Sequence, residues 1–210
     1  MTRSQTPPLF VLSDQEEAWA AALPVQRGDH YRWSRRWLRS WLGELFKVQP
    51  AFVPLWAPPG QPPRLDEGWG FISLSHCPDA LLVGWAPWRI GVDLERSDRQ
   101  IPASALLRRF FCSAEQQALQ RLEAEPLRRA VLQSWLRKEA AIKWQWGSLA
   151  QDLGDWCCDL DHQMVIHQRN GLAVWSLCWN VGEWSLAMAL GHRDVPDDGE
   201  VLQAVRLCLA

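Results

Sequence analysis

Two long segments of the chain carry apolar side chains at helical spacing. In residues 29–46 they recur every three or four positions, and the same period returns in residues 126–146. Pro126 and Gly147 mark the beginning and end of the second segment. Shorter helices are predicted at residues 14–22, with an acidic first turn, and at 114–123, where Ser113 and Gln116 form a capping-box pattern.

Strand-like segments follow each long helix. The first group comprises residues 70–75, 80–86 and 90–95, whose short links are typical of an antiparallel meander. The second group comprises residues 156–160, 163–168, 173–179 and 184–190, with turns at Asn170-Gly171 and Asn180–Glu183. After Pro196 the pattern is acidic and then weakly helical.

The order of these elements repeats. Residues 36–39 (RWLR) and 134–137 (SWLR) are similar, and each lies in a long helix that precedes a strand hairpin. This predicts an α+β fold of two pseudo-symmetric halves, residues 1–89 and 90–210, each a long helix packed on a small antiparallel sheet. Chance similarity in a chain rich in Trp and Arg explains a four-residue match equally well, so both interpretations stay open.

The length, charge and composition of the chain exclude several classes of protein. The chain has 210 residues, a net charge of −2 and 22% charged residues, which excludes a disordered, collagen-like or coiled-coil protein. The balanced charge argues against general nucleic-acid binding. Without a membrane-length apolar stretch or a signal-peptide pattern, we expect a cytoplasmic protein with no membrane partner. The six cysteines show no zinc-like spacing, and all are predicted to be reduced, mostly apolar fillers.

Lysine is scarce: only Lys47, Lys138 and Lys143 occur among 22 basic residues. Two of the three flank an apolar stripe of the second long helix, and Glu139 falls inside that stripe. The stripe is formed by Val131, Trp135, Ile142 and Trp146. One interpretation is an ordinary ion pair between Glu139 and Lys143, one turn apart. The other is that Glu139 ligates a cation, because a carboxylate in an apolar stripe is costly to bury unpaired.

Asp93 and Glu95 alternate with Val92 and Leu94 in a predicted strand, so the two carboxylates share one face. A solvated strand face explains this pattern by itself. A hard cation such as Mg²⁺ between the carboxylates explains it too, and Mg²⁺ completes its shell with phosphate oxygens and water. Joined to Glu139 and the two lysines, the pair would form a site for a metal-bound pyrophosphate.

These motifs resemble a known family. Residues 91–95 (GVDLE) followed by 135–143 (WLRKEAAIK) are similar to the paired signature of the 4′-phosphopantetheinyl transferases. Residues 73–76 (SLSH) resemble the family's SHS motif, and 108–112 (RRFFC) its RFFS segment. The two-halved layout is similar to the monomeric Sfp-type branch, although Gln61 replaces the lysine that usually precedes the SHS strand.

The resemblance implies transfer of the phosphopantetheine arm of coenzyme A to a serine of an apo acyl or peptidyl carrier protein. Adenosine 3′,5′-bisphosphate would leave. Mg²⁺ would be held by Asp93, Glu95 and Glu139, with Glu139 as the base for the serine hydroxyl. Lys143 would stabilise or protonate the departing phosphate. Contacts to coenzyme A are implied for Ser75, His76, Lys138, Arg32 and Arg27.

Two other functions fit the same residues. One is a non-catalytic module that binds carrier proteins or coenzyme A. The other is a metal-dependent phosphohydrolase that acts on nucleotides. The complete set of carboxylates and lysines favours catalysis over mere binding, since a binding module has little need of three metal ligands.

Overall fold

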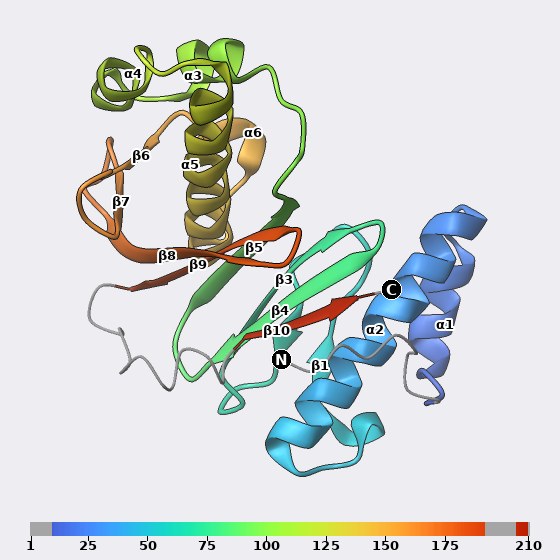
Figure 1. Ribbon diagram of the computed structural model, residues 1–210. Helices are drawn as coiled ribbons and strands as arrows, with labels where there is room; N and C mark the ends of the chain where they lie inside the picture. Colours follow the sequence, from blue (N-terminus) through green and yellow to red (C-terminus); the bar gives the residue numbers. More distant parts are fainter. Residues whose placement is uncertain (1–9, 192–204, 210) are drawn as a thin grey trace.

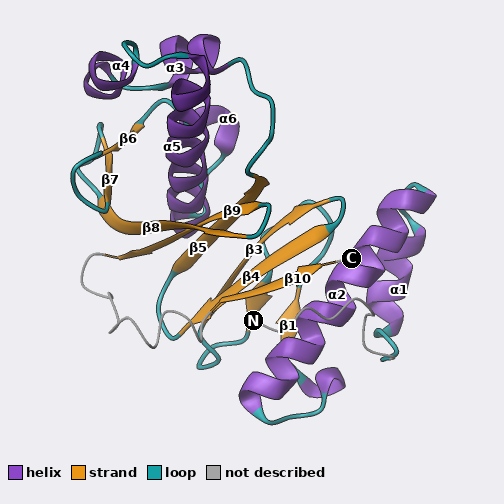
Figure 2. Ribbon diagram, in the orientation of Figure 1, coloured by secondary structure: helices purple, strands orange, loops and turns teal. Residues whose placement is uncertain are grey.

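Two larger antiparallel sheets, each covered by a long helix, and a small two-stranded sheet form the described part of the molecule, in agreement with the predicted α+β class (Figures 1 and 2). The computed structural model describes residues 10–191 and 205–209. Its helices are α1 (Asp14–Ala21), α2 (Val25–Phe46), α3 (Ala103–Phe110), α4 (Ser113–Leu119), α5 (Ala124–Gln145) and α6 (Leu149–Asp152). Its strands are β1 (Leu55–Trp56), β2 (Arg64–Leu65), β3 (Phe71–Cys77), β4 (Ala80–Ala86), β5 (Ile90–Arg96), β6 (Trp156–Cys158), β7 (Met164–His167), β8 (Ala173–Val181), β9 (Trp184–Gly191) and β10 (Val205–Leu209).

The first sheet has the order β10-β4-β3, and α2 lies across it (Figure 1). Leu38 and Leu42 of α2 are fully buried and belong to one apolar cluster with Leu81 of β4. Helix α1 packs beside α2, where a buried ion pair joins Glu16 to Arg39 at 2.8 Å. These contacts fix α2, whose N-terminal turns contribute to the site described below.

The second sheet has the order β5-β9-β8-β7-β6, and α5 packs on β5 and β9. Gly91 in β5 permits this approach, because a Cβ atom there would lie 1.9 Å from the carbonyl oxygen of Ala140 in α5. Asp93 and Glu95 follow Gly91 on the same face of the strand. Val92 and Leu94 are buried in an apolar cluster with Leu82, Leu186 and Met188. The predicted alternation along this strand is therefore confirmed.

The sequence-based boundaries agree with the structure for both long helices and most strands, but two predictions are wrong and one helix was missed. β5 pairs with β9 and not with β4, so the first three strands form no meander. Residues 205–209 form β10, which pairs with β4, and are not helical. Helix α3 was not predicted. The predicted turn at Asn170-Gly171 is present, and Gly171 adopts a positive φ of 70°.

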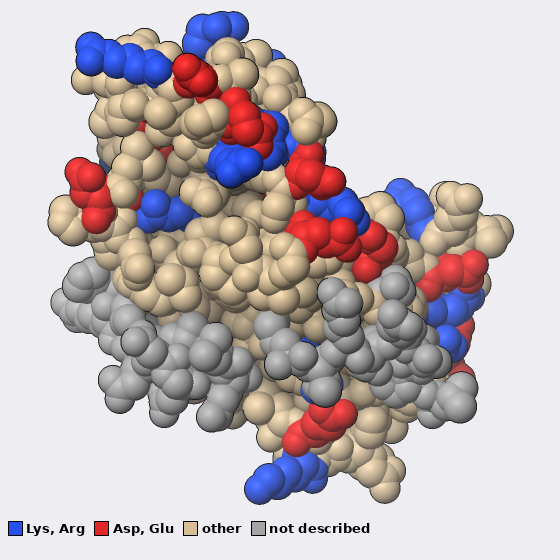
Figure 3. Space-filling view, in the orientation of Figure 1, with Lys and Arg blue, Asp and Glu red and all other residues tan. Residues whose placement is uncertain are grey.

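Charged side chains do not gather into one continuous basic patch on the face of the described residues drawn in Figure 3, where acidic and basic groups lie side by side. Arg96 is an example, because it pairs with Asp79 at 3.2 Å and with Glu183 at 2.7 Å. Of the helices in the described part of the chain, none has the length and apolarity needed to cross a membrane.

Candidate functional site

Asp93 lies at the centre of the site, where β5 meets β3 and α5. Its side chain is buried, and its Oδ1 atom accepts hydrogen bonds from Lys143 Nζ at 2.6 Å and from Ser75 Oγ at 2.7 Å. Its Oδ2 atom is equally buried but has no hydrogen-bond partner among the described residues. A buried carboxylate oxygen without a donor is costly, so a ligand that binds it would relieve that cost.

Glu95 on β5 and Glu139 on α5 are both close enough to Asp93 for its charge to act on them. Glu95 accepts a hydrogen bond from Arg99, and burial raises its pKa while the Arg99 charge opposes the rise. Glu139 accepts a hydrogen bond from Trp135 Nε1. Burial and the charge of Asp93 raise the pKa of Glu139 to about 7, although Lys143 acts in the opposite direction. The carboxylates therefore repel one another in a partly desolvated site.

The three carboxylates suit a hard cation in chemistry, since all of their donor atoms are oxygens. Their ligand atoms do not all lie within 4.8 Å of one another, and two other triads of described residues meet that distance. The orphaned Asp93 Oδ2 and the mutual repulsion of the carboxylates fit a bound divalent cation. Glu95 and Glu139 would then exchange their present donors, Arg99 and Trp135, for the cation.

The other two triads are already satisfied internally. In the first, Cys112 and Cys157 are joined to each other and Glu115 accepts from Lys138. The second comprises Asp152, Asp155 and His167. There Asp155 pairs with Arg169 at 2.9 Å, and His167 Nδ1 accepts from the Arg169 backbone N–H, so both residues have partners within the protein.

A cavity of about 470 Å³ lies between the N-terminal turns of α2 and the end of β3. Its polar wall comes from α2 and from the end of β3. The residues that supply this wall are Arg27, His30, Tyr31, Ser34, Arg35 and His76. Because most of its ionisable groups are cationic or can become so, the cavity favours an anionic ligand.

Arg35 is the most buried cation of this wall. Its Nε atom donates to the Ala57 carbonyl at 3.0 Å, and its guanidinium lies 4.4 Å from the centre of the Tyr31 ring. Burial lowers its pKa from the usual value of 12.5. The rings of His30 and His76 lie 5.0 Å apart, and burial lowers the pKa of both imidazoles.

The structure brings together only some of the residues that the resemblance implied for coenzyme A. Arg27 and His76 line the cavity. Arg32 does not, because it pairs with Glu17 at 2.7 Å and with Asp29 at 3.2 Å. Ser75 turns its hydroxyl to Asp93.

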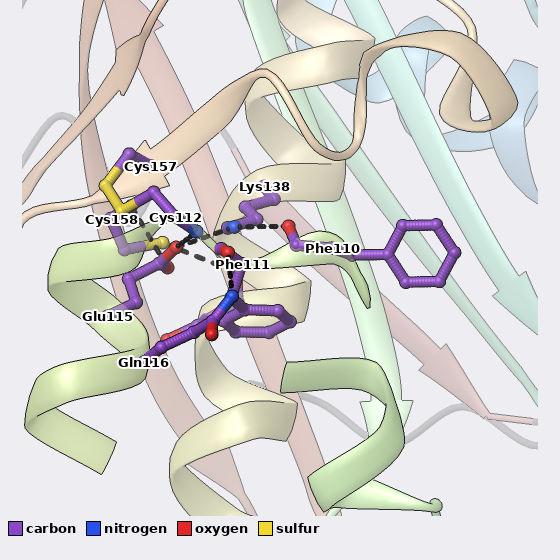
Figure 4. The surroundings of a disulfide bond; sticks show 9 residues. Phe110, Phe111, Cys112, Glu115, Gln116, Lys138, Cys157 and Cys158 are labelled. Carbon is purple, nitrogen blue, oxygen red and sulfur yellow. Dashed lines mark hydrogen bonds and ion pairs between the residues drawn. A yellow bond between two sulfur atoms is a disulfide. The ribbon is translucent and has the colours of Figure 1, made fainter. Parts of the chain in front are cut away.

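Lys138 is also away from the cavity and has no exposed surface. Its ammonium donates to Glu115 at 2.8 Å and to the Phe110 carbonyl at 3.1 Å, and lies 4.1 Å from the Phe111 ring centre (Figure 4). The expected contact between Lys138 and a phosphate is therefore wrong for this arrangement. Lys138 joins α5 to the α3–α4 segment instead.

Sequence reasoning missed His30 and Arg35. Both follow Arg27 on α2 at spacings that return to the same helix face, which is the signal that would have identified them. The predicted stripe of α5 was also only partly right. Trp146 is 47% exposed, and the fully buried face is formed by Leu136, Ala140 and Ala141. Of the two interpretations of Glu139, the ion pair with Lys143 is not found among the described residues, because Lys143 pairs with Asp93 at 2.6 Å.

The prediction that all six cysteines are reduced is wrong for two of them. Cys112 and Cys157 form a disulfide between the start of α4 and β6 (Figure 4). Cys112, and not Ser113, caps α4, and Glu115 accepts a hydrogen bond from its backbone N–H at 3.0 Å. Cys157 and Cys158 occupy opposite faces of β6, so only Cys157 reaches Cys112 while Cys158 is buried.

Comparison of the sequence with known protein families identifies the family of the chain. No curated protein matches the chain. Residues 89–195, just over half of the 210, match the sequence model of the ACPS family, described as the 4′-phosphopantetheinyl transferase superfamily. The matched range includes Asp93, Glu95, Glu139 and Lys143. The chain therefore belongs to the 4′-phosphopantetheinyl transferase superfamily.

Proposed function

We propose that the chain transfers the phosphopantetheine arm of coenzyme A to a serine of an apo acyl or peptidyl carrier protein in a Mg²⁺-dependent reaction. Family membership supports phosphopantetheine transfer in general. The observation that carries the finer proposal is the environment of Asp93. One of its oxygens is bonded to Lys143, the other is buried without a partner among the described residues, and a cationic cavity is lined by the neighbouring strand β3 and by α2.

Asp93, Glu95 and Glu139 are the residues that would hold Mg²⁺. The cation supplies neutralisation of the pyrophosphate charge when it is bound. Around it, Lys143 is 31% exposed, and its ammonium is a compact cation that can approach a phosphate oxygen while it remains near Asp93.

The reaction exchanges one phosphorus–oxygen bond for another. The carrier serine oxygen bonds to the phosphorus that carries the pantetheine arm, and the bond from that phosphorus to adenosine 3′,5′-bisphosphate breaks. Glu139 takes the serine proton, as a carboxylate placed beside the reacting groups can. Lys143 stabilises the charge on the departing bisphosphate.

The nucleotide end of coenzyme A would occupy the cavity beside α2. Arg27 and Arg35 supply permanent positive charge, and His30 and His76 supply further donors. Gln61 stands where relatives of the Sfp type carry a lysine, and it is exposed next to Gly60 of the cavity wall. These α2 cations therefore take the place of the missing lysine in the proposal.

We assign the chain to the monomeric Sfp-type branch and to the cytoplasm as part of this proposal. Support comes from the two halves: His76 and Ser75 belong to the first sheet, while Asp93 and Lys143 belong to the second half. One chain thus supplies both sides of the site. Light scattering after size-exclusion chromatography would contradict the monomer if activity accompanied only an oligomer.

Transfer is tested by incubating the protein with apo carrier proteins of several classes, coenzyme A and Mg²⁺, and weighing each carrier by mass spectrometry. We expect one carrier class to gain the mass of one phosphopantetheine. Glu139→Gln should reduce the rate by about 10²-fold or more, the range for loss of a general base. Glu123→Gln is the matched control, since Glu123 is exposed just before α5 and should leave the rate unchanged.

Other outcomes would favour the alternatives. Carrier binding without any mass gain would indicate a binding module. Release of free phosphopantetheine without a carrier would indicate a phosphohydrolase. A normal rate in Glu139→Gln would remove Glu139 from the proposed mechanism.

A further inference from the structure

Two serines of β3 join the two halves of the molecule. The Oγ atom of Ser73 accepts from the Val92 backbone N–H at 3.0 Å, and the Oγ atom of Ser75 donates to Asp93 Oδ1 at 2.7 Å. Both serines are buried, and β3 and β5 belong to different sheets. The serine side chains therefore bridge two strands that share no backbone ladder.

The alternation of β3 separates Ser75 from the cavity. Leu74, His76 and, at the end of the strand, Cys77 line the cavity, whereas Ser75, whose hydroxyl bonds to Asp93, is absent from its wall. Neighbouring side chains of a strand point to opposite faces, so Ser73 and Ser75 face β5 while Leu74 and His76 face α2. A ligand in the cavity would meet His76 and would not meet the Ser75 hydroxyl.

The Ser75 hydroxyl also determines which carboxylate oxygen of Asp93 receives hydrogen bonds. Ser75 and Lys143 both donate to Oδ1, which leaves Oδ2 buried and without a partner among the described residues. If Ser75 were absent, Lys143 would be the remaining side-chain donor to the carboxylate in the described part of the chain. Its side chain is 31% exposed and long enough to bridge both oxygens. Rotation of Asp93 toward Lys143 would then cover the oxygen that is now free.

We infer that Ser75 is a positioning residue that holds Asp93 with Oδ2 open for a divalent cation. This inference rests on the proposed function, because it takes Asp93 as a cation ligand. It gives Ser75 a different role from the contact with coenzyme A that the family resemblance implied. Partners that orient a metal ligand typically change metal affinity or activity by about 10–100-fold when they are removed.

The test measures Mn²⁺ binding, with Mn²⁺ as a paramagnetic substitute for Mg²⁺, by electron paramagnetic resonance in the absence of coenzyme A. We expect Ser75→Ala to weaken Mn²⁺ binding by about 10–100-fold. Ser75→Thr keeps the hydroxyl and should restore most of the affinity. Ser73→Ala is the matched control, because it removes a similar bond between the same two strands without touching Asp93.

A second measurement separates positioning from ligand contact. Titration calorimetry with coenzyme A and a chelator should give the same affinity for wild type and Ser75→Ala. In the transfer assay, Ser75→Ala should need more Mg²⁺ for half-maximal rate, while KM for coenzyme A at saturating Mg²⁺ stays unchanged. Circular dichroism should show the same fold in all four proteins.

The results that overturn the inference differ from those that overturn the proposed function. Unchanged Mn²⁺ affinity in Ser75→Ala, with weaker metal-free binding of coenzyme A, would make Ser75 a ligand contact and leave the proposed function standing. Equal losses in Ser73→Ala and Ser75→Ala would make the effect one of general packing and overturn the inference. No Mn²⁺ binding by the wild type would overturn both.

Discussion

His30 and His76 face each other across the wall of the cavity, one from α2 and one from β3. Burial is the main reason that the pKa of each imidazole is lowered from 6.5, and Arg35 acts in the same direction on both. Lys143 also lowers the pKa of His76, while Asp93 raises it. The folded pocket therefore disfavours protonation of either imidazole relative to the unfolded chain.

We expect acid to destabilise the protein through these two residues. The unfolded chain binds protons below pH 6.5, whereas the folded chain does so only below its lowered pKa values. Stability is therefore full above pH 6.5 and decreases as the pH falls through that value. Measured by urea unfolding, the free energy of unfolding should decrease less between about pH 7.5 and pH 5.5 for His30→Asn/His76→Asn than for the wild type. If the variant and the wild type lost the same free energy of unfolding, other titratable groups would be the cause of the acid sensitivity.

At the scale of elements, α5 is held by a buried ion pair as well as by apolar packing. The Lys138 and Glu115 side chains have no exposed surface, and Glu115 also accepts from the backbone N–H groups of Cys112 and Cys158. The pair joins α5 to α4 and β6 one residue before Glu139. Replacing one member of the ion pair by a neutral residue leaves the charge of the other member buried without a counter-ion.

Lys138→Met should therefore lower the free energy of unfolding by about 3–5 kcal/mol. The double variant Lys138→Met/Glu115→Gln should recover part of this loss, because the introduced glutamine is neutral and its amide oxygen can accept from one of the two backbone N–H groups that Glu115 now binds. Urea unfolding of both variants gives the comparison. If the double variant were as unstable as the single one, the loss would come from packing and not from an unpaired charge.

The disulfide between α4 and β6 encloses α5 in a covalent loop. Its cysteines are 45 residues apart, and the chain-entropy model for a loop of that length gives about 4 kcal/mol of stabilisation. Reduction with dithiothreitol should lower the free energy of unfolding by an amount of this order. Cys157→Ser should have a similar effect and should abolish the response to reductant. A thiol titration that finds six free cysteines without reductant would contradict the bond.

These elements show what the sequence could and could not predict. Helix periods and strand alternation depend on near neighbours, so α2, α5 and β5 and the shared face of Asp93 and Glu95 were predictable. The partner of β5 was not, because short links suggested pairing with β4 and only the completed sheet selects β9. The burial of Lys138 depends on Glu115 in another helix, and no pattern within α5 shows it.

At the scale of the whole molecule, residues 205–209 belong to a sheet that is otherwise formed by residues 71–86. β10 pairs with β4 along the edge opposite β3, and thus completes the sheet on which α2 packs (Figure 1). Val205 and Leu207 join the same apolar cluster as Leu82 of β4 and Val92 of β5. Residues from both larger sheets therefore share one core, so the two sheets should unfold together.

Truncation after residue 204 tests this coupling. It would expose the edge of β4 and remove Val205 and Leu207, whose burial stabilises by about 1.5–3 kcal/mol each. We therefore expect a loss of at least about 3 kcal/mol. Tryptophan fluorescence and circular dichroism should still report one common transition, because the shared core leaves neither half independent.

Arg206→Ala is the control for the truncation. It removes the ion pair with Glu44 at the surface but keeps the strand, so its cost should stay below about 1 kcal/mol. If truncation cost no more than this substitution, β10 would contribute little to the core. If the two spectroscopic signals separated, the halves would be independent folding units. A larger loss with coincident signals would show that β10 stabilises the shared core and, with it, the Ser75–Asp93 bond between the sheets.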